Sequence, residues 1–182
     1  MRRAAIPTEI ITSIVHFAGL KTLDTSLSTV NTKGVHVHSS GSAVSSKDWI
    51  WTSPLDSAAL ARIAAVQVIT ISSDQGWASY PEHGSYSWFD IGLLRPSSDG
   101  NQEVCWRTSH HNQLAKKESV RREGSVITME DKMWDNVKVG DVIAVRVCAQ
   151  FGGWVNNAEF GQIKVWNWFE PVIPVSSRSL ED

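Results

Sequence analysis

Apolar residues near the start of the sequence recur at the spacing of an α-helix. Four of them lie three or four positions apart: Ile6, Ile10, Ile14 and Phe17. This spacing places the side chains on one helix face, while Pro7 near the start and Gly19 near the end are typical of helix boundaries. The pattern predicts an amphipathic helix within residues 6–20.

The next two segments carry weaker patterns. Residues 21–31 place Leu23, Leu27 and Val30 at helical spacing, which favours a second short helix. Residues 32–46 are rich in serine and glycine and contain a brief Val-His-Val-His alternation. This composition predicts a linker or an edge strand.

From Lys47 onward the apolar residues alternate with polar ones, and turn signals separate the runs. The seven runs predicted to be strands are 47–52, 65–73, 85–95, 103–112, 119–129, 141–151 and 158–169. Short helical turns are expected at Leu55–Ile63 and Asp131–Val137. Many short strands with few helices predict a mainly β protein, an antiparallel β-sandwich of jelly-roll type.

Alternation within two strands predicts which side chains enter the core. In residues 141–151, the inward set is Ile143, Val145, Val147, Ala149 and Phe151, and the outward set is Ala144, Arg146, Cys148 and Gln150. In the last strand, Trp166 and Trp168 fall on the same face as Gln162 and Lys164. Either the N-terminal helix covers these two indoles, which we expect because its apolar stripe must be buried, or they form a contact surface.

These patterns divide the chain into four segments: a helical segment over 1–31, a linker over 32–46, the sandwich domain over 47–170 and a tail over 171–182. A chain of 182 residues is long enough for one domain with a full core.

Charge and cysteine content restrict the partners and the compartment. The formal net charge is -2 with 20% charged residues, which favours neither nucleic acid nor an acidic membrane surface. No apolar run reaches about 18 residues, and Pro7, Glu9 and His16 interrupt the segment that would form a signal peptide. Two cysteines, Cys105 and Cys148, are too few for a disulfide scaffold and are expected to be free thiols. We predict a cytoplasmic protein.

Motifs for catalysis and metal binding are weak. No G-x-S-x-G motif occurs, and His110 and His111, as neighbours on a strand, point to opposite faces and cannot chelate one ion. The carboxylates Asp74, Glu82 and Asp90 match no calcium-binding spacing. The sequence therefore predicts a protein that is not an enzyme and has no cofactor and no metal site.

Tryptophan and glycine mark two loops as a candidate binding site. Nine tryptophans are many for this length, and Asp74-Gln-Gly-Trp77 is echoed by Phe151-Gly-Gly-Trp154. Exposed ring faces beside amides and carboxylates can hold a sugar ring or a protein segment. The candidate ligand-binding residues are Gln75, Trp77, Tyr80, Glu82, His83, Trp88, Trp154 and Asn156. The alternative is that Trp77 and Trp154 close the ends of the core, which leaves the polar members as the better candidates.

Residues 44–169 contain a series of short motifs: Leu55-Asp56, Ala59-Leu-Ala-Arg-Ile63, Asp74-Gln-Gly-Trp77, Tyr80-Pro-Glu, Ser87-Trp-Phe89, Leu94-Arg-Pro96, Trp106, Val139-Gly-Asp-Val-Ile143 and Ala149-Gln-Phe-Gly-Gly-Trp-Val-Asn156. In these motifs the segment resembles the β-sandwich domain of a largely uncharacterised group of fungal proteins. The chain departs from the pattern at Phe151-Gly-Gly, where one glycine replaces an expected proline, and in a short loop between Glu82 and Trp88. The shorter loop implies a shallower site.

The N-terminal segment is similar in outline to the start of an F-box, with partner-binding candidates Ile6, Pro7, Ile10, Ile14 and Phe17. An F-box grips a Skp1-type adaptor with three helices, but the third would fall on residues 35–43, whose β-branched, serine and glycine content disfavours a helix. The resemblance implies a degenerate F-box. If it were functional, the sandwich would recognise the substrate of a ubiquitin ligase.

Overall fold

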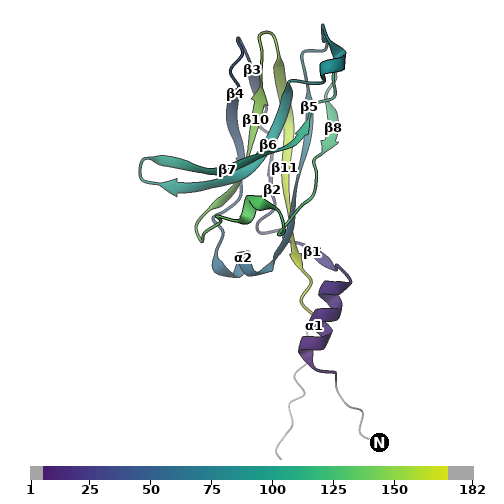
Figure 1. The fold of residues 1–182 in the computed structure, drawn as a ribbon, viewed down its shortest axis with the longest axis vertical. Helices are drawn as coiled ribbons and strands as arrows, with labels where there is room; N and C mark the ends of the chain where they lie inside the picture. Colours follow the sequence, from purple (N-terminus) through teal and green to yellow (C-terminus); the bar gives the residue numbers. More distant parts are fainter. Residues whose placement is uncertain (1–5, 172–182) are drawn as a thin grey trace, which may run out of the picture.

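Two antiparallel sheets packed face to face make up most of the molecule (Figure 1). The structure is a computed structural model, and it describes residues 6–171. The predicted β-sandwich with a helix near the N-terminus is confirmed. Of the predicted tail over 171–182, all but Pro171 lies outside the described residues.

Each sheet is built around a pair of long central strands. The seven-stranded sheet contains β1 Lys21–Leu23, β2 Thr29–Asn31, β3 Val35–His38, β5 Ile63–Ser73, β8 Val120–Glu123, β9 Ile127–Thr128 and β11 Val155–Trp168. The four-stranded sheet contains β4 Ser45–Trp51, β6 Ser87–Ser97, β7 Gly100–His111 and β10 Val142–Ala149, in the order β4-β10-β6-β7. The helices are α1 Thr8–Phe17, α2 Ser57–Arg62 and the 3-10 turns η1 Pro81–His83 and η2 Lys132–Trp134.

Strand order identifies the sandwich as a jelly roll. Strands β1, β2 and β3 pair in turn with β11, and β8 and β9 both pair with β5, so each group acts as one interrupted strand. Counted in this way, the eight strands are ordered 1-8-3-6 and 2-7-4-5. This order places two Greek keys back to back, as in double-sheet jelly rolls.

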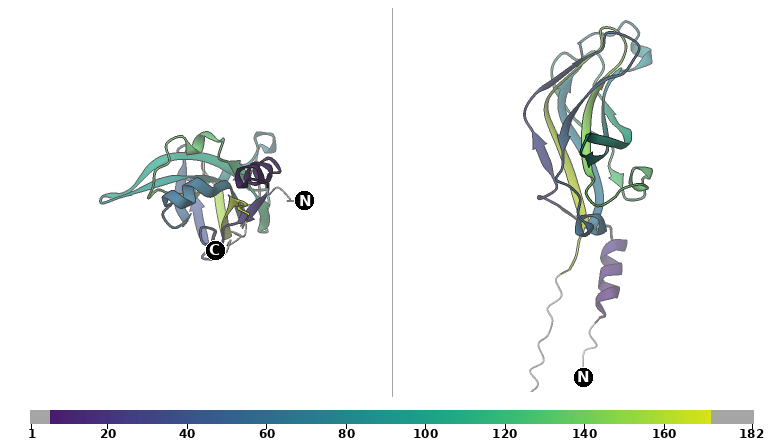
Figure 2. Two further views of the ribbon diagram at one scale, coloured as in Figure 1. Left: turned by 90° about the horizontal axis from the view of Figure 1, so that it is seen from below. Right: turned by 90° about the vertical axis from the view of Figure 1, so that its left-hand side faces the viewer.

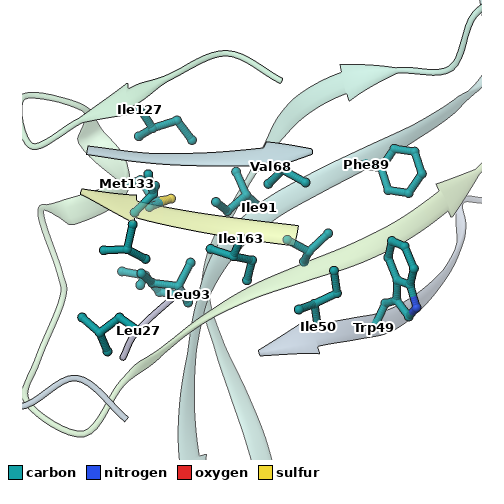
Figure 3. Packing of buried hydrophobic residues seen from close by; sticks show 14 of the residues in the cluster. Leu27, Trp49, Ile50, Val68, Phe89, Ile91, Leu93, Ile127, Met133 and Ile163 are labelled. Carbon is teal, nitrogen blue, oxygen red and sulfur yellow. The ribbon is translucent and has the colours of Figure 1, made fainter. Parts of the chain in front are cut away.

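The core lies between the two sheets, where alternate side chains from both meet (Figure 3). Ile91 of β6 and Ile163 of β11 are fully buried there. The predicted inward residues Ile143, Val145, Val147 and Ala149 belong to this cluster. Phe151 does not, because it lies in the turn after β10 with a φ of 68° and is 38% exposed. The prediction that Phe151 points into the core is therefore wrong.

Residues 21–46 differ from the prediction. The second helix expected in 21–31 is absent, because β1 and β2 hydrogen-bond to the free edge of β11. Between them, the buried Asp24 carboxylate accepts from the backbone N–H groups of Ser26 and Leu27 and fixes a turn. The expected linker over 32–46 contains β3, which agrees with the edge-strand alternative. This segment completes the sheet because the edge of β11 supplies hydrogen-bonding groups that local spacing does not reveal.

Helix α1 confirms the helix predicted within residues 6–20, but it projects from one end of the sandwich (Figures 1 and 2). Its contacts with the body include the His16 ring, whose centroid is 5.0 Å from that of Trp168, and Val15, which is buried. Trp166 and Trp168 are half-buried, and α1 contacts Trp168 through His16. The apolar stripe of the helix is not buried against the last strand as expected, since Ile14 is 58% and Phe17 is 96% exposed. Among residues 6–171, no helix is long and apolar enough to cross a membrane.

Candidate functional site

The β5–β6 and β10–β11 connections lie at the end of the sandwich opposite α1 (Figure 1), and a cleft of about 450 Å³ opens between them. It lies between the β5–β6 connection and the turn from β10 to β11, the two loops that the sequence marked. We call it the aromatic cleft, after the residues that line it: Trp77, Tyr80, His83, Tyr86, Phe151 and Trp154, with Ala78, Ser79 and Gly152 between them.

The Asp74 carboxylate holds the base of the first loop. Asp74 is 1% exposed, and its Oδ1 accepts from the backbone N–H of Gly76 at 2.7 Å and of Lys116 at 3.0 Å. Its Oδ2 accepts from the backbone N–H of Ala115 at 2.7 Å. Gly76 has a φ of +86°, a conformation that favours glycine. Asp74 thereby joins the loop of Trp77 to a neighbouring loop and fixes the direction of the chain into the cleft.

The Gln75 side chain hydrogen-bonds to both segments that flank the cleft. Its Nε2 donates to the carbonyl oxygen of Trp77 at 2.6 Å, and its Oε1 accepts from the backbone N–H of Val155 at 3.2 Å. Both ends of the amide are therefore engaged by the fold. Gln75 positions Trp77 relative to β11 and does not line the cleft.

The rings of the cleft form a packed floor and an exposed rim. Tyr86 meets Phe151 edge to face at 4.6 Å and 86°, and Trp154 at 5.3 Å and 81°, which are favourable aromatic geometries. On the rim, Trp77 is 57% and Tyr80 is 65% exposed. Tyr86 and Trp154 are half-buried and form the floor, whereas Trp77, Tyr80 and the 38% exposed Phe151 leave ring surface in contact with solvent.

Asn156 cannot contact a ligand in this structure, because it is fully buried. Its Nδ2 donates to the carbonyl oxygens of Trp88 and Cys148, and its Oδ1 accepts from Nδ2 of Asn112 at 2.9 Å. The amide therefore bridges the two sheets beneath the cleft.

Glu82 and Trp88 also lie away from the cleft lining. The side chain of Glu82 is 63% exposed, and its contact with His83 is 4.0 Å long. Trp88 lies on the outer face of the four-stranded sheet, where its indole N–H donates to Asp90 at 2.8 Å. Of the eight predicted ligand-binding residues, the structure brings together Trp77, Tyr80, His83 and Trp154.

Five cleft residues are missing from the predicted set: Ala78, Ser79, Tyr86, Phe151 and Gly152. The inward assignment of Phe151 extends the alternation of β10 two residues past its end at Ala149. The two glycines after it were the signal that the strand had ended, because successive glycines mark a turn.

The outer sheet face, defined here by Trp88, Asp90, Trp106 and Arg146, is a second aromatic surface. Asp90 is 5% exposed and accepts from the Trp88 indole, the Thr108 hydroxyl and Nε of Arg146. The Arg146 guanidinium lies 4.4 Å from the Trp106 ring centroid in a cation–π contact. The charges and the Trp88 N–H of this surface are thus paired within the protein.

Further candidate features of the described residues lie outside the aromatic cleft. A cavity of about 520 Å³ lies beside β7 and η2, where Arg107 pairs with Asp131. Both cysteines are free thiols, as predicted, and burial raises the pKa of each above its ordinary value. Within residues 6–171, no three His, Cys, Asp or Glu side chains are grouped closely enough to hold a metal ion.

Comparison with known proteins identifies no relative, so the function is inferred from the fold and the cleft. No family model matches the sequence, and no curated protein matches it.

Proposed function

We propose that this chain is a non-catalytic recognition module that binds a glycan or a protein segment in the aromatic cleft. The observation that carries the proposal is the exposure of Trp77 and Tyr80 on the rim of a cleft whose floor rings are already packed. Leaving large apolar rings in water is unfavourable, and covering them with a ligand recovers that free energy.

The site is also held in position before any ligand arrives. Asp74 and Gln75 together make five hydrogen bonds to backbone groups of the cleft loops and the segments beside them. A preformed site loses little conformational entropy on binding, so more of the contact energy appears as affinity.

The test compares wild type with Trp77→Ala and with Trp51→Ala on glycan and peptide arrays. Trp51 is 43% exposed on β4 and lies outside the cleft lining, so it is a matched control for an exposed indole. We expect ligands of the wild type to be lost by Trp77→Ala and kept by Trp51→Ala. Identical binding profiles for the three proteins would contradict the proposal.

A second candidate function is partner docking through α1, supported by the exposure of its stripe. Ile6, Ile10, Ile14 and Phe17 are all at least half exposed. Apolar residues at this spacing on a projecting helix fit an apolar groove on another protein. The F-box resemblance makes a Skp1-type adaptor the partner to test, although the segment after α1 forms strands and supplies no second or third helix.

Point substitutions test this docking, because deleting residues 21–38 would remove three strands from the sheet. We expect Ile10→Asp with Ile14→Asp to abolish capture of a purified Skp1-type adaptor by the full chain. Thr8→Asp is the control, since at about 100° per residue Thr8 lies on the opposite side of the helix from the stripe. No capture by wild type, or equal capture by the double variant, would contradict adaptor docking.

A further inference from the structure

Of the four polar side chains expected to hold sugar hydroxyls, only His83 lines the aromatic cleft. Gln75 is engaged at both ends of its amide, Asn156 is fully buried, and Glu82 lies outside the lining. A sugar ring carries several hydroxyls, and each one buried without a hydrogen-bond partner costs free energy. The remaining lining is dominated by rings, which favours a ligand with more apolar surface and fewer polar groups.

Four hydrogen-bonding groups of the cleft rings are free within residues 6–171. The indole N–H groups of Trp49, Trp88 and Trp134 donate to protein oxygens. Those of Trp77 and Trp154, and the hydroxyls of Tyr80 and Tyr86, have no such protein partner, and none of the four is a buried unsatisfied atom. They are single donors next to ring faces, a combination that suits isolated carbonyl oxygens beside apolar groups.

A polyproline II segment has this chemistry. It contains no internal hydrogen bonds, so its carbonyl oxygens are free to accept, and its proline rings pack into aromatic-lined grooves. The conformation is also largely preformed, which reduces the entropy lost on binding.

Charge is consistent with the same ligand. Among the described residues, the cleft lining contains no Asp, Glu, Lys or Arg side chain. A charged ligand would lose hydration there without gaining an ion pair to such a side chain, whereas an uncharged segment has no ionic hydration to lose. Apart from the imidazole of His83, the described lining offers no basic group to an anionic glycan or an acidic peptide.

We propose that the aromatic cleft binds an uncharged proline-rich protein segment in the polyproline II conformation. Proline rings cover the exposed faces of Trp77 and Tyr80, and the indole and phenol groups donate to the backbone carbonyls between them. This proposal rests on the proposed recognition function of the cleft and selects the class of its ligand.

The experiment titrates the full chain with decaproline, with a Pro-Pro-Leu repeat and with a Gly-Ser peptide of equal length, and follows the indole N–H signals by NMR. We expect the two proline-rich peptides to shift the signals of Trp77 and Trp154, and the Gly-Ser peptide to shift neither. Trp77→Ala weakens binding about tenfold, the loss of one aromatic contact of roughly 1.4 kcal/mol. Trp51→Ala leaves the affinity unchanged.

A parallel titration with neutral oligosaccharides of glucose, mannose and N-acetylglucosamine separates the two proposals. If sugars shift the Trp77 and Trp154 signals and proline-rich peptides do not, the ligand class is overturned and the recognition function stands. If proline-rich peptides shift neither signal at millimolar concentration, the ligand class is overturned. If, in addition, the array profiles do not depend on Trp77, the recognition function fails as well.

Discussion

The aromatic cleft and the outer sheet face both combine tryptophans with polar groups, but they differ in what those groups already contact. On the outer sheet face, Asp90 satisfies the Trp88 indole and Arg146, and Arg146 covers Trp106. In the cleft, Trp77 is 57% and Tyr80 is 65% exposed, and the Tyr80 ring stacks on His83 with centroids 5.6 Å apart. The difference shows that the number of aromatic residues does not locate a site. An exposed ring on a loop that hydrogen bonds hold in position is a better indicator of a binding site.

Register explains why the two surfaces differ. Asp90 pairs with Arg146 across β6 and β10, and with Thr108 across β6 and β7, so cross-strand neighbours meet on one face. The cleft rings belong to loops and a strand end, where no adjacent strand supplies such neighbours. Within the described residues, cross-strand neighbours therefore engage the Trp88 N–H and the charges of the outer sheet face, but they leave the buried Trp106 N–H without a partner. The cleft differs in that the hydrogen-bonding groups of its rings are not buried.

The largest expected effect is on stability, from Asp90→Ala. The substitution leaves Arg146, the Trp88 indole and the Thr108 hydroxyl without their shared acceptor. Breaking a mostly buried ion pair of this kind costs about 3 to 4 kcal/mol of unfolding free energy, measured by denaturant titration. Glu103→Ala is the control, because Glu103 is 64% exposed and contacts Arg146 only at 3.5 Å, so its loss should cost less than about 1 kcal/mol. Equal losses of unfolding free energy for Asp90→Ala and Glu103→Ala would mean that the buried Asp90 stabilises the outer sheet face no more than an exposed carboxylate does.

A comparable effect follows from pH, through His110 in the interior beneath both surfaces. Burial, with smaller contributions from Arg122 and His111, lowers the pKa of His110 from 6.5 to about 4. The folded protein keeps the ring neutral, whereas the unfolded chain takes up a proton below about pH 6.5. The stabilisation is therefore complete above that pH and is lost as the pH falls toward 4, by about 3 kcal/mol.

Unfolding free energies measured between pH 7 and pH 4 check this expectation. His110→Gln should remove that part of the pH dependence, while His111→Gln, at the exposed neighbouring position, should retain it. A pH dependence that survives in His110→Gln would assign the effect to other groups.

The smallest effect sharpens the comparison most directly, since it concerns one tryptophan from each surface. Trp88→Ala removes a half-buried, hydrogen-bonded indole and should cost about 2 kcal/mol of unfolding free energy. Trp77→Ala removes a ring that is 57% exposed and should cost less than about 1 kcal/mol. The measurement is the denaturant concentration at the midpoint of unfolding, compared between the variants when their m-values are equal. A larger cost for Trp77→Ala would mean that Trp77 is mainly structural.

Much of the fold follows from local sequence patterns. Period-two alternation located each of the seven predicted strand runs, and spacing of three and four located α1. The same patterns failed in residues 21–31, where helical spacing of Leu23, Leu27 and Val30 competed with pairing to β11. Pairing with a strand more than a hundred residues away leaves no local signal in so short a segment.

The sequence by itself determined which loops form the cleft, because glycines interrupt the alternation at Gly76 and Gly152 and place tryptophans beside the breaks. Only the tertiary structure decided which side chains of those loops remain available. Gln75 and Asn156 look alike as amides in the sequence, yet backbone groups from distant strands use both of them. Trp77 is exposed at the end of the sandwich, where none of the strands in residues 6–171 packs over it. Composition shows which groups can form hydrogen bonds, whereas packing decides which of them already do.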